Sequence, residues 1–166
     1  MGAKTFADFC IENNRRHAGN FDKADVPAPP RYKAAVVACM DARIETGRLL
    51  GLSEGDAHVI RNAGGVVTDD VLRSLLISQR LLGTEEIILV QHTECGMLTF
   101  RDDDLKDEIE ADTGLRPSFP LESFSHLEEN VRRSIRRIQA CPFIPVRDRI
   151  RGFVYNVRTG LLEEVL

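Results

Sequence analysis

The chain has 166 residues, of which 43% are hydrophobic and 29% are charged, and its formal net charge is −4. This length fits one globular domain with a core of its own, and the composition excludes a disordered or collagen-like chain. The mild acidic excess lacks the basic footprint of a nucleic-acid-binding protein. We therefore expect one domain over residues 1–166 that binds no nucleic acid.

The apolar segments are too short to cross a membrane. The longest clean apolar run, Ala34–Met40, falls far short of the roughly 20 residues that a spanning helix needs. The N-terminus shows neither the charged nor the apolar region of a secretory signal. Four cysteines without an export signal are typical of free thiols or metal ligands. These features predict a cytoplasmic protein with no membrane partner.

The first thirty residues predict a helix followed by an irregular arm. In the segment Thr5–Ala18, apolar and amide side chains recur at three- and four-residue intervals, and Gly19 is a reasonable stop. Three prolines within residues 20–30 then indicate a chain that runs over the surface. We expect residues 1–30 to form an N-terminal helix and arm attached to the main domain.

Three short apolar segments beyond the arm have the composition of buried strands: Lys33–Met40, Ala57–Arg61 and Glu86–Gln91. A turn and a short helix ending near Leu52 separate the first two. Thr68 is a suitable N-cap for the next helix, which has one apolar face and which Gly83 closes. This order of elements places a helix between successive strands.

The last third of the chain predicts two further helices and a pair of strands. The acidic segment Asp102–Asp112 has apolar residues one turn apart, and Ser125 with Glu128 predicts a capping box for a helix to about Gln139. A tight turn at Thr159–Gly160 joins two strand segments, Arg151–Val157 and Leu161–Val165. Strands that alternate with helices predict an α/β fold with a mostly parallel, four- to five-stranded sheet flanked by helices.

Metal-ligating side chains follow two of the predicted strands. Cys39 lies at the end of the first strand, and His92 and Cys95 follow a later one. Ligands bind beyond the carboxyl ends of strands in such sheets, so we expect these segments to meet at one edge. Two thiolates and an imidazole suit a tetrahedral zinc ion, and three protein ligands leave a position open for water, as in catalytic sites.

A carboxylate and a guanidinium come directly after the first cysteine. Asp41 and Arg43 share a turn with Cys39, which places both beside the open metal position. A carboxylate there accepts a hydrogen bond from metal-bound water or binds the metal itself. Arginine would hold the carboxylate aside through a charge-assisted contact.

Three motifs, in this order and separation, resemble those of the β-class carbonic anhydrases: Cys39-Met-Asp41-Ala-Arg43, Arg61-Asn-Ala-Gly-Gly65 and His92-Thr-Glu-Cys95. The similarity is strong from about Lys33 to Phe100. It implies zinc bound by Cys39, His92 and Cys95, with Asp41 and Arg43 as a gating pair. It also implies a homodimer or a dimer of dimers, in which the first helix packs on the partner subunit.

The resemblance implies reversible hydration of carbon dioxide to bicarbonate and a proton through zinc-bound hydroxide. Gly64, Gly65 and Val66 are the candidate substrate-binding residues, because carbon dioxide needs only a small apolar pocket. Two thiolates cancel the charge of the metal, so we expect activity to rise on the alkaline side of pH 7.

Two alternatives remain open at this point. Some relatives with the same ligands hydrolyse carbon disulfide or carbonyl sulfide, so the ligand set does not define the substrate. A zinc-binding regulatory protein without turnover is the other alternative. The intact pair of Asp41 and Arg43 argues against it, because a structural metal needs neither side chain.

Overall fold

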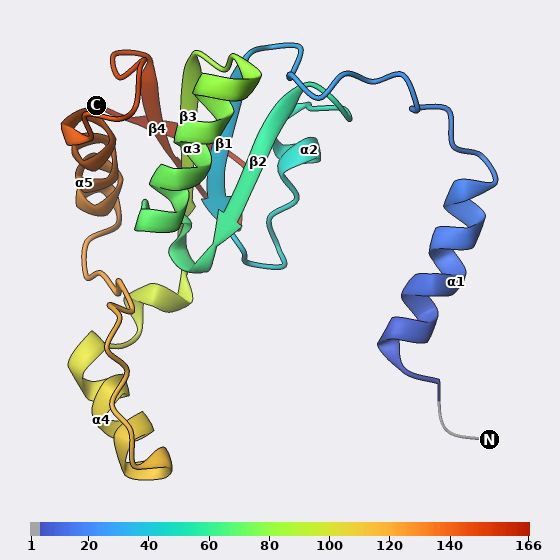
Figure 1. Cartoon of the computed structure of the whole chain (residues 1–166). Coiled ribbons are helices and arrows are strands. Elements are labelled where there is room, and N and C mark those ends of the chain that lie inside the picture. Colours follow the sequence, from blue (N-terminus) through green and yellow to red (C-terminus); the bar gives the residue numbers. More distant parts are fainter. Residues whose placement is uncertain (1–3) are drawn as a thin grey trace.

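A five-stranded sheet lies at the centre of the computed structural model, which describes residues 4–166 (Figure 1). The strand order is β2-β1-β3-β4-β5, and only β4 and β5 pair in antiparallel fashion. The strands are β1 (Ala34–Cys39), β2 (Ala57–Asn62), β3 (Glu86–His92), β4 (Ile150–Tyr155) and β5 (Leu162–Val165). The mostly parallel sheet predicted from the sequence is confirmed.

Five helices and two single 3-10 turns connect or precede these strands within the described residues. The helices are α1 (Phe6–Ala18), α2 (Thr46–Leu50), α3 (Asp69–Leu82), α4 (Asp102–Thr113) and α5 (Leu127–Ala140), and the turns are η1 (Ala63–Gly65) and η2 (Gly96–Leu98). α3 contacts β1 and β2, whereas α5 contacts β3, β4 and β5. Across residues 4–166, no helix combines the length and the apolar character needed to span a bilayer.

The core forms where α3 and α5 pack against one face of the sheet at β1 and β3. Val37 of β1 and Leu89 of β3 are fully buried, and they belong to one apolar cluster with Leu75 of α3 and Ile138 of α5. α3 begins and ends as predicted, because the Thr68 hydroxyl caps it and Gly83 adopts a left-handed conformation. The sheet thereby presents the carboxyl ends of β1 and β3 side by side.

The predicted capping box at the start of α5 is wrong. The helix begins at Leu127, and its N-cap is His126, which makes no side-chain cap hydrogen bond. Glu128 therefore lies one position too early for a capping box, which pairs the N-cap with the third helical residue. Its carboxylate instead accepts a hydrogen bond from Arg132 at 3.1 Å, one turn further along the helix.

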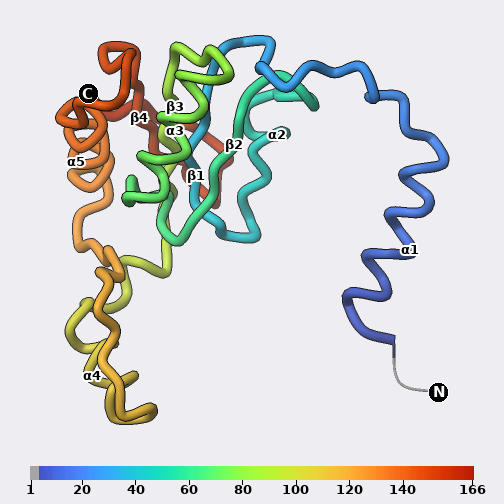
Figure 2. Tube along the Cα trace, in the orientation of Figure 1, coloured from blue at the N-terminus to red at the C-terminus, as the bar shows by residue number. Residues whose placement is uncertain are grey.

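The N-terminal helix and arm extend away from the sheet, as the tube in Figure 2 shows. Thr5 and Asp8 form a capping box that defines the start of α1, yet no residue of this helix is buried. Phe6 and Phe9 are 79% and 56% exposed. The chain returns to the sheet just before β1, where the amide of Tyr32 donates to the carbonyl of Asp56 at 3.0 Å.

Candidate metal centre

Three metal-ligating side chains meet at the carboxyl ends of two neighbouring strands. Cys39 ends β1, His92 ends β3, and Cys95 lies just beyond β3. One donor atom of each residue lies within 4.8 Å of those of the other two, and all three residues are buried. The parallel pairing of β1 with β3 brings these ends together. The structure therefore unites the side chains that the strand order predicted to meet.

The chemistry of these donors fits a zinc ion. The Nδ1–H of His92 donates to the carbonyl of Thr93 at 2.8 Å, the kind of contact that orients a ligating imidazole. Its Nε2 is buried and has no hydrogen-bond partner among residues 4–166. An unpartnered buried nitrogen is costly, and a cation beside two thiolate sulfurs would satisfy it. The three side chains thus form a cluster that can bind a metal.

The two thiols of the cluster influence each other's protonation. A hydrogen bond from Cys95 lowers the pKa of Cys39 to about 4, although burial opposes this shift. The same contact, together with burial, raises the pKa of Cys95. Without a metal the pair therefore holds one thiolate and one thiol. Binding of a divalent ion by both sulfurs must displace the remaining proton.

Asp41 lies beside the cluster and is held by Arg43. Its Oδ2 is 3.7 Å from the Nε2 of His92, too far for a hydrogen bond. Arg43 donates from Nε to Oδ1 at 2.9 Å and from Nη2 to Oδ2 at 2.7 Å. This bidentate contact keeps the pKa of Asp41 well below its usual range. The carboxylate therefore stays charged and bound to the arginine.

Arg61 stabilises the same turn, a role that the sequence reasoning missed. Its Nε donates to the carbonyl of Cys39 at 3.0 Å, and its Nη2 donates to the carbonyl of Asp41 at 2.8 Å. Arg61 lies on β2 opposite Ala38 of β1, so its side chain reaches the end of the neighbouring strand. The position of Arg61 in the second sequence motif was a signal that it matters, but the spacing along the chain did not indicate its contact with the turn after β1.

The glycine pair after β2 packs tightly against the metal centre. A Cβ on Gly65 would lie 2.9 Å from the backbone nitrogen of Cys39, and one on Gly64 would lie 2.9 Å from the side chain of Met97. Both glycines have positive φ angles, of 79° at Gly64 and 60° at Gly65. The next residue, Val66, is buried and exchanges two hydrogen bonds with the side chain of Asn62. Close packing therefore requires these glycines, and their contact with substrate stays a prediction.

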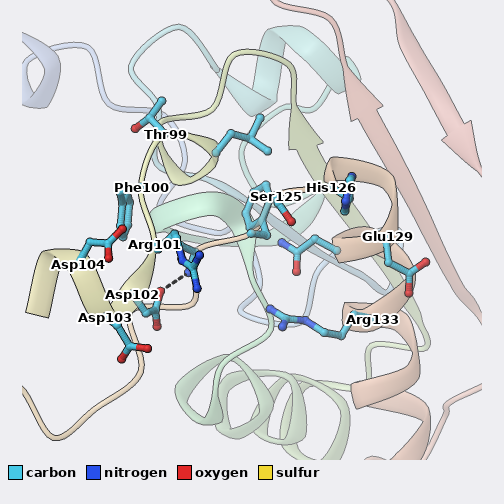
Figure 3. A pocket seen from close by; sticks show the side chains of 14 residues that line it. Thr99, Phe100, Arg101, Asp102, Asp103, Asp104, Ser125, His126, Glu129 and Arg133 are labelled. Atoms are coloured by element: carbon cyan, nitrogen blue, oxygen red, sulfur yellow. Dashed lines mark hydrogen bonds between the residues drawn. The ribbon is translucent and has the colours of Figure 1, made fainter.

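A cavity of about 630 Å³ lies between η2, the start of α4 and α5 (Figure 3). Side chains of both charges line it, including Arg101, Asp102 and Arg133, and none of the three candidate ligands does. Asp102 accepts hydrogen bonds from three backbone amides of residues 121–123. Phe124 lines the cavity and also packs against the apolar cluster of Cys39 and Cys95, so the cavity and the metal centre share this side chain.

Comparisons with known proteins agree with this geometry. The family model for carbonic anhydrase matches residues 34–118. Over 161 residues the chain is 56% identical to β-carbonic anhydrase 1 of Mycobacterium tuberculosis, with 97% of this chain and 98% of the relative covered. The chain belongs to the β-carbonic anhydrase family. The family membership inferred from the three motifs is thus confirmed.

Relatives of this chain differ in the substrates that their names give. A carbonic anhydrase structure from Streptococcus mutans has a TM-score of 0.90 and 38% identity, with both chains fully covered. The carbon disulfide hydrolase of Acidithiobacillus thiooxidans is 36% identical over 154 residues, which cover 81% of this chain and 77% of that protein. Family membership therefore accounts for the fold. The substrate of this chain has to be inferred from its degree of identity to each relative and from the geometry of the site.

Proposed function

We propose that this β-carbonic anhydrase catalyses the reversible hydration of carbon dioxide to bicarbonate and a proton. The observation that carries the proposal is the bidentate pair of Asp41 and Arg43 beside a cluster of three metal donors. A structural zinc site has four protein ligands and needs no such pair. The 56% identity to β-carbonic anhydrase 1 along almost the whole chain supports the same activity.

Cys39, His92 and Cys95 would hold one zinc ion per chain. When bound, zinc supplies a water whose pKa lies near neutrality, which makes it the nucleophile of the hydration. Asp41 stays anionic because Arg43 holds it, and it presents an acceptor oxygen beside the cluster. We assign Asp41 the orientation of that water, and Arg43 the orientation of Asp41. Activity that rises on the alkaline side of pH 7 follows from the two thiolate ligands.

Gly64, Gly65 and Val66 are the proposed wall of the substrate pocket. Carbon dioxide is small, linear and apolar, so it needs an apolar surface next to the nucleophile. Val66 is 2% exposed and directly follows the glycine pair that packs against Cys39 and Met97. The tight packing of Gly65 against the backbone of Cys39 supports the nearness of this segment to the metal centre.

Exposed apolar residues on α1 support the proposed homodimer or dimer of dimers. Phe6, Phe9 and Ile11 are each more than half exposed, and a cluster of large exposed apolar side chains marks an interaction surface. A β-carbonic anhydrase from Sordaria macrospora that shares this fold, at 18% identity and a TM-score of 0.72, is described as tetrameric. We place the helix and arm of residues 1–30 over the partner subunit, although residues 1–3 lie outside the described part of the chain.

The state of the cysteines supports the proposed cytoplasmic location. Cys39 and Cys95 are assigned to the metal, and the two remaining cysteines, Cys10 and Cys141, are free. Free thiols outside a metal site are typical of a reducing compartment.

Hydrolysis of carbon disulfide is the second candidate activity. A relative named for it, from Acidithiobacillus thiooxidans, aligns with 81% of this chain. Its identity of 36% is well below the 56% shared with β-carbonic anhydrase 1, and this difference favours carbon dioxide.

Stopped-flow measurement of carbon dioxide hydration, combined with metal analysis, tests the proposal. We expect about one zinc per chain and rapid proton release from the wild type. Asp41→Ala should keep the zinc and lose most of the rate. Asp70→Ala, which removes an exposed carboxylate paired with Arg73, is the matched control and should be unchanged. Hydrogen sulfide release from carbon disulfide without carbon dioxide hydration would favour the second candidate. Zinc with neither activity would indicate a regulatory protein.

A further inference from the structure

Glu94 lies between the candidate ligands His92 and Cys95 and has an unusual backbone conformation. Its φ angle is 57°, in the left-handed region that side chains other than glycine rarely adopt. Such a conformation costs free energy and persists where surrounding contacts hold it, often at functional sites. The contacts of Glu94 therefore show which interactions depend on this backbone conformation.

Glu94 accepts hydrogen bonds from Arg43 through both its backbone and its side chain. The carbonyl oxygen of Glu94 accepts from Nη2 at 3.1 Å, and its Oε2 accepts from Nη1 at 3.5 Å. Asp41 occupies the edge of the guanidinium formed by Nε and Nη2. Glu94 therefore contacts the second edge of the same guanidinium, formed by Nη1 and Nη2.

Arg158 contacts the other oxygen of the Glu94 carboxylate. Its Nε donates to Oε1 of Glu94 from the turn between β4 and β5. The amide of Arg158 donates to Oδ1 of Asn156 at 2.9 Å, which fixes the backbone of this turn. Charges thus alternate from the metal centre outward, in the order Asp41, Arg43, Glu94 and Arg158.

We infer that Glu94 and Arg158 are positioning residues that hold Arg43 in the orientation in which it grips Asp41. The side chain of Arg43 is 47% exposed, and an isolated ion pair at such a site contributes little to stability. With Glu94 in place, a rotation of the guanidinium breaks two hydrogen bonds to Glu94 as well as the two to Asp41. The inference rests on the proposed function, because the orientation of Asp41 matters for hydration.

Arg158→Gln is the first test, because this residue lies outside the segment that carries the metal ligands. We expect one zinc per chain, an unchanged KM and a kcat lowered about two- to fivefold, the scale of one exposed ion pair within a network. Arg158→Lys keeps the positive charge and should recover part of the loss. Glu94→Gln should lower kcat further, since it weakens both contacts of the carboxylate.

Glu164→Gln is the matched control. Glu164 is 33% exposed and paired with Arg151 on the sheet, whereas Glu94 is 42% exposed. The control therefore removes an ion pair of similar exposure that does not reach Arg43, and its kcat should equal that of the wild type.

A second measurement does not depend on the loaded enzyme. In ¹H–¹⁵N spectra of the metal-free protein, the Nε–H of Arg43 exchanges slowly with solvent while its hydrogen bond to Asp41 persists. Arg158→Gln and Glu94→Gln should accelerate this exchange, and Glu164→Gln should not. Unchanged exchange and unchanged kcat in both variants would overturn the inference. A wild type without carbon dioxide hydration would contradict the proposed function instead, and the exchange rates would then still decide whether Glu94 and Arg158 position Arg43.

Discussion

The metal centre and the N-terminal helix differ in whether this chain itself buries their side chains. Cys39, His92 and Cys95 are buried, and the strands that carry them bring them together. α1 has clear helix signals of its own, yet none of its residues is buried in the described chain. The pairing of parallel strands thus assembles the metal site within one chain. The exposed aromatic residues of α1 would be buried only against a surface that this chain does not provide, such as that of a partner subunit.

Loss of a candidate ligand should give the largest effect, and it should be confined to the metal centre. We expect Cys39→Ser to lower zinc affinity and hydration rate by more than about 100-fold, since even outer contacts of a metal ligand are worth about 10- to 100-fold. Metal analysis and stopped-flow kinetics measure this. Cys141→Ser, at a free cysteine outside the cluster, should keep both. A Cys39→Ser protein with one zinc and full rate would contradict the assignment.

A side chain at Gly65 should disturb the packing behind the metal centre. Gly65→Ala places a Cβ 2.9 Å from the backbone nitrogen of Cys39, in a residue with φ of 60°. We expect the free energy of unfolding to fall by about 2–4 kcal/mol, from left-handed strain and overpacking together. Gly83→Ala isolates the strain, because Gly83 has φ of 70° and open space around it. Equal losses in chemical denaturation of the two variants would contradict tight packing at Gly65.

Changes on α1 should affect association and leave the metal centre intact. Replacing both Phe6 and Phe9 by serine should raise the dissociation constant of the oligomer about thirtyfold, the scale of an interface hot spot. Zinc content should not change. Arg15→Ser, on the opposite side of the same helix, is the control. Analytical ultracentrifugation measures the effect, and an unaltered dissociation constant would show that α1 does not form the interface.

The smallest expected effect is the change in zinc affinity per pH unit, and it again concerns the metal centre alone. The pKa of Cys95 is raised, so its thiol must lose a proton when the metal binds, whereas Cys39, with a pKa of about 4, is already a thiolate near neutrality. Burial opposes a rise in the pKa of His92, but its contact with Cys39 raises it, so the imidazole must also lose a proton to bind the metal. Zinc affinity should therefore fall by at least about tenfold for each unit by which the pH drops between 8 and 6. Competition with a chelator at several pH values measures this slope. An affinity that is independent of pH would contradict the shared proton.

Much of the fold could be predicted because its signals are local. The strand predicted over Lys33–Met40 is β1, and the cap at Thr68 and the stop at Gly83 bound α3 as expected. The capping box at Ser125 failed because a shift of one residue in the helix start destroys the motif. Such a shift depends on tertiary contacts that the local sequence does not encode.

The candidate site could be predicted in part, for a related reason. The predicted strand order and three short motifs were enough to predict that Cys39, His92 and Cys95 lie together, as they do in the structure. The contact of Glu94 with Arg158 joins residues 64 positions apart, and no local pattern indicates it. The reach of Arg61 to the end of β1 likewise depends on the register between β1 and β2.

The adjacency of β1 and β3 has a consequence for ion capture. Because the hydrogen bonds between these two strands set the spacing of the first sulfur and the imidazole, this part of the site is preorganised before any ion arrives. The entropy cost of arranging these donors then falls on folding and not on binding. The apoprotein should accordingly take up its ion without refolding, in contrast to small domains that fold only around their metal.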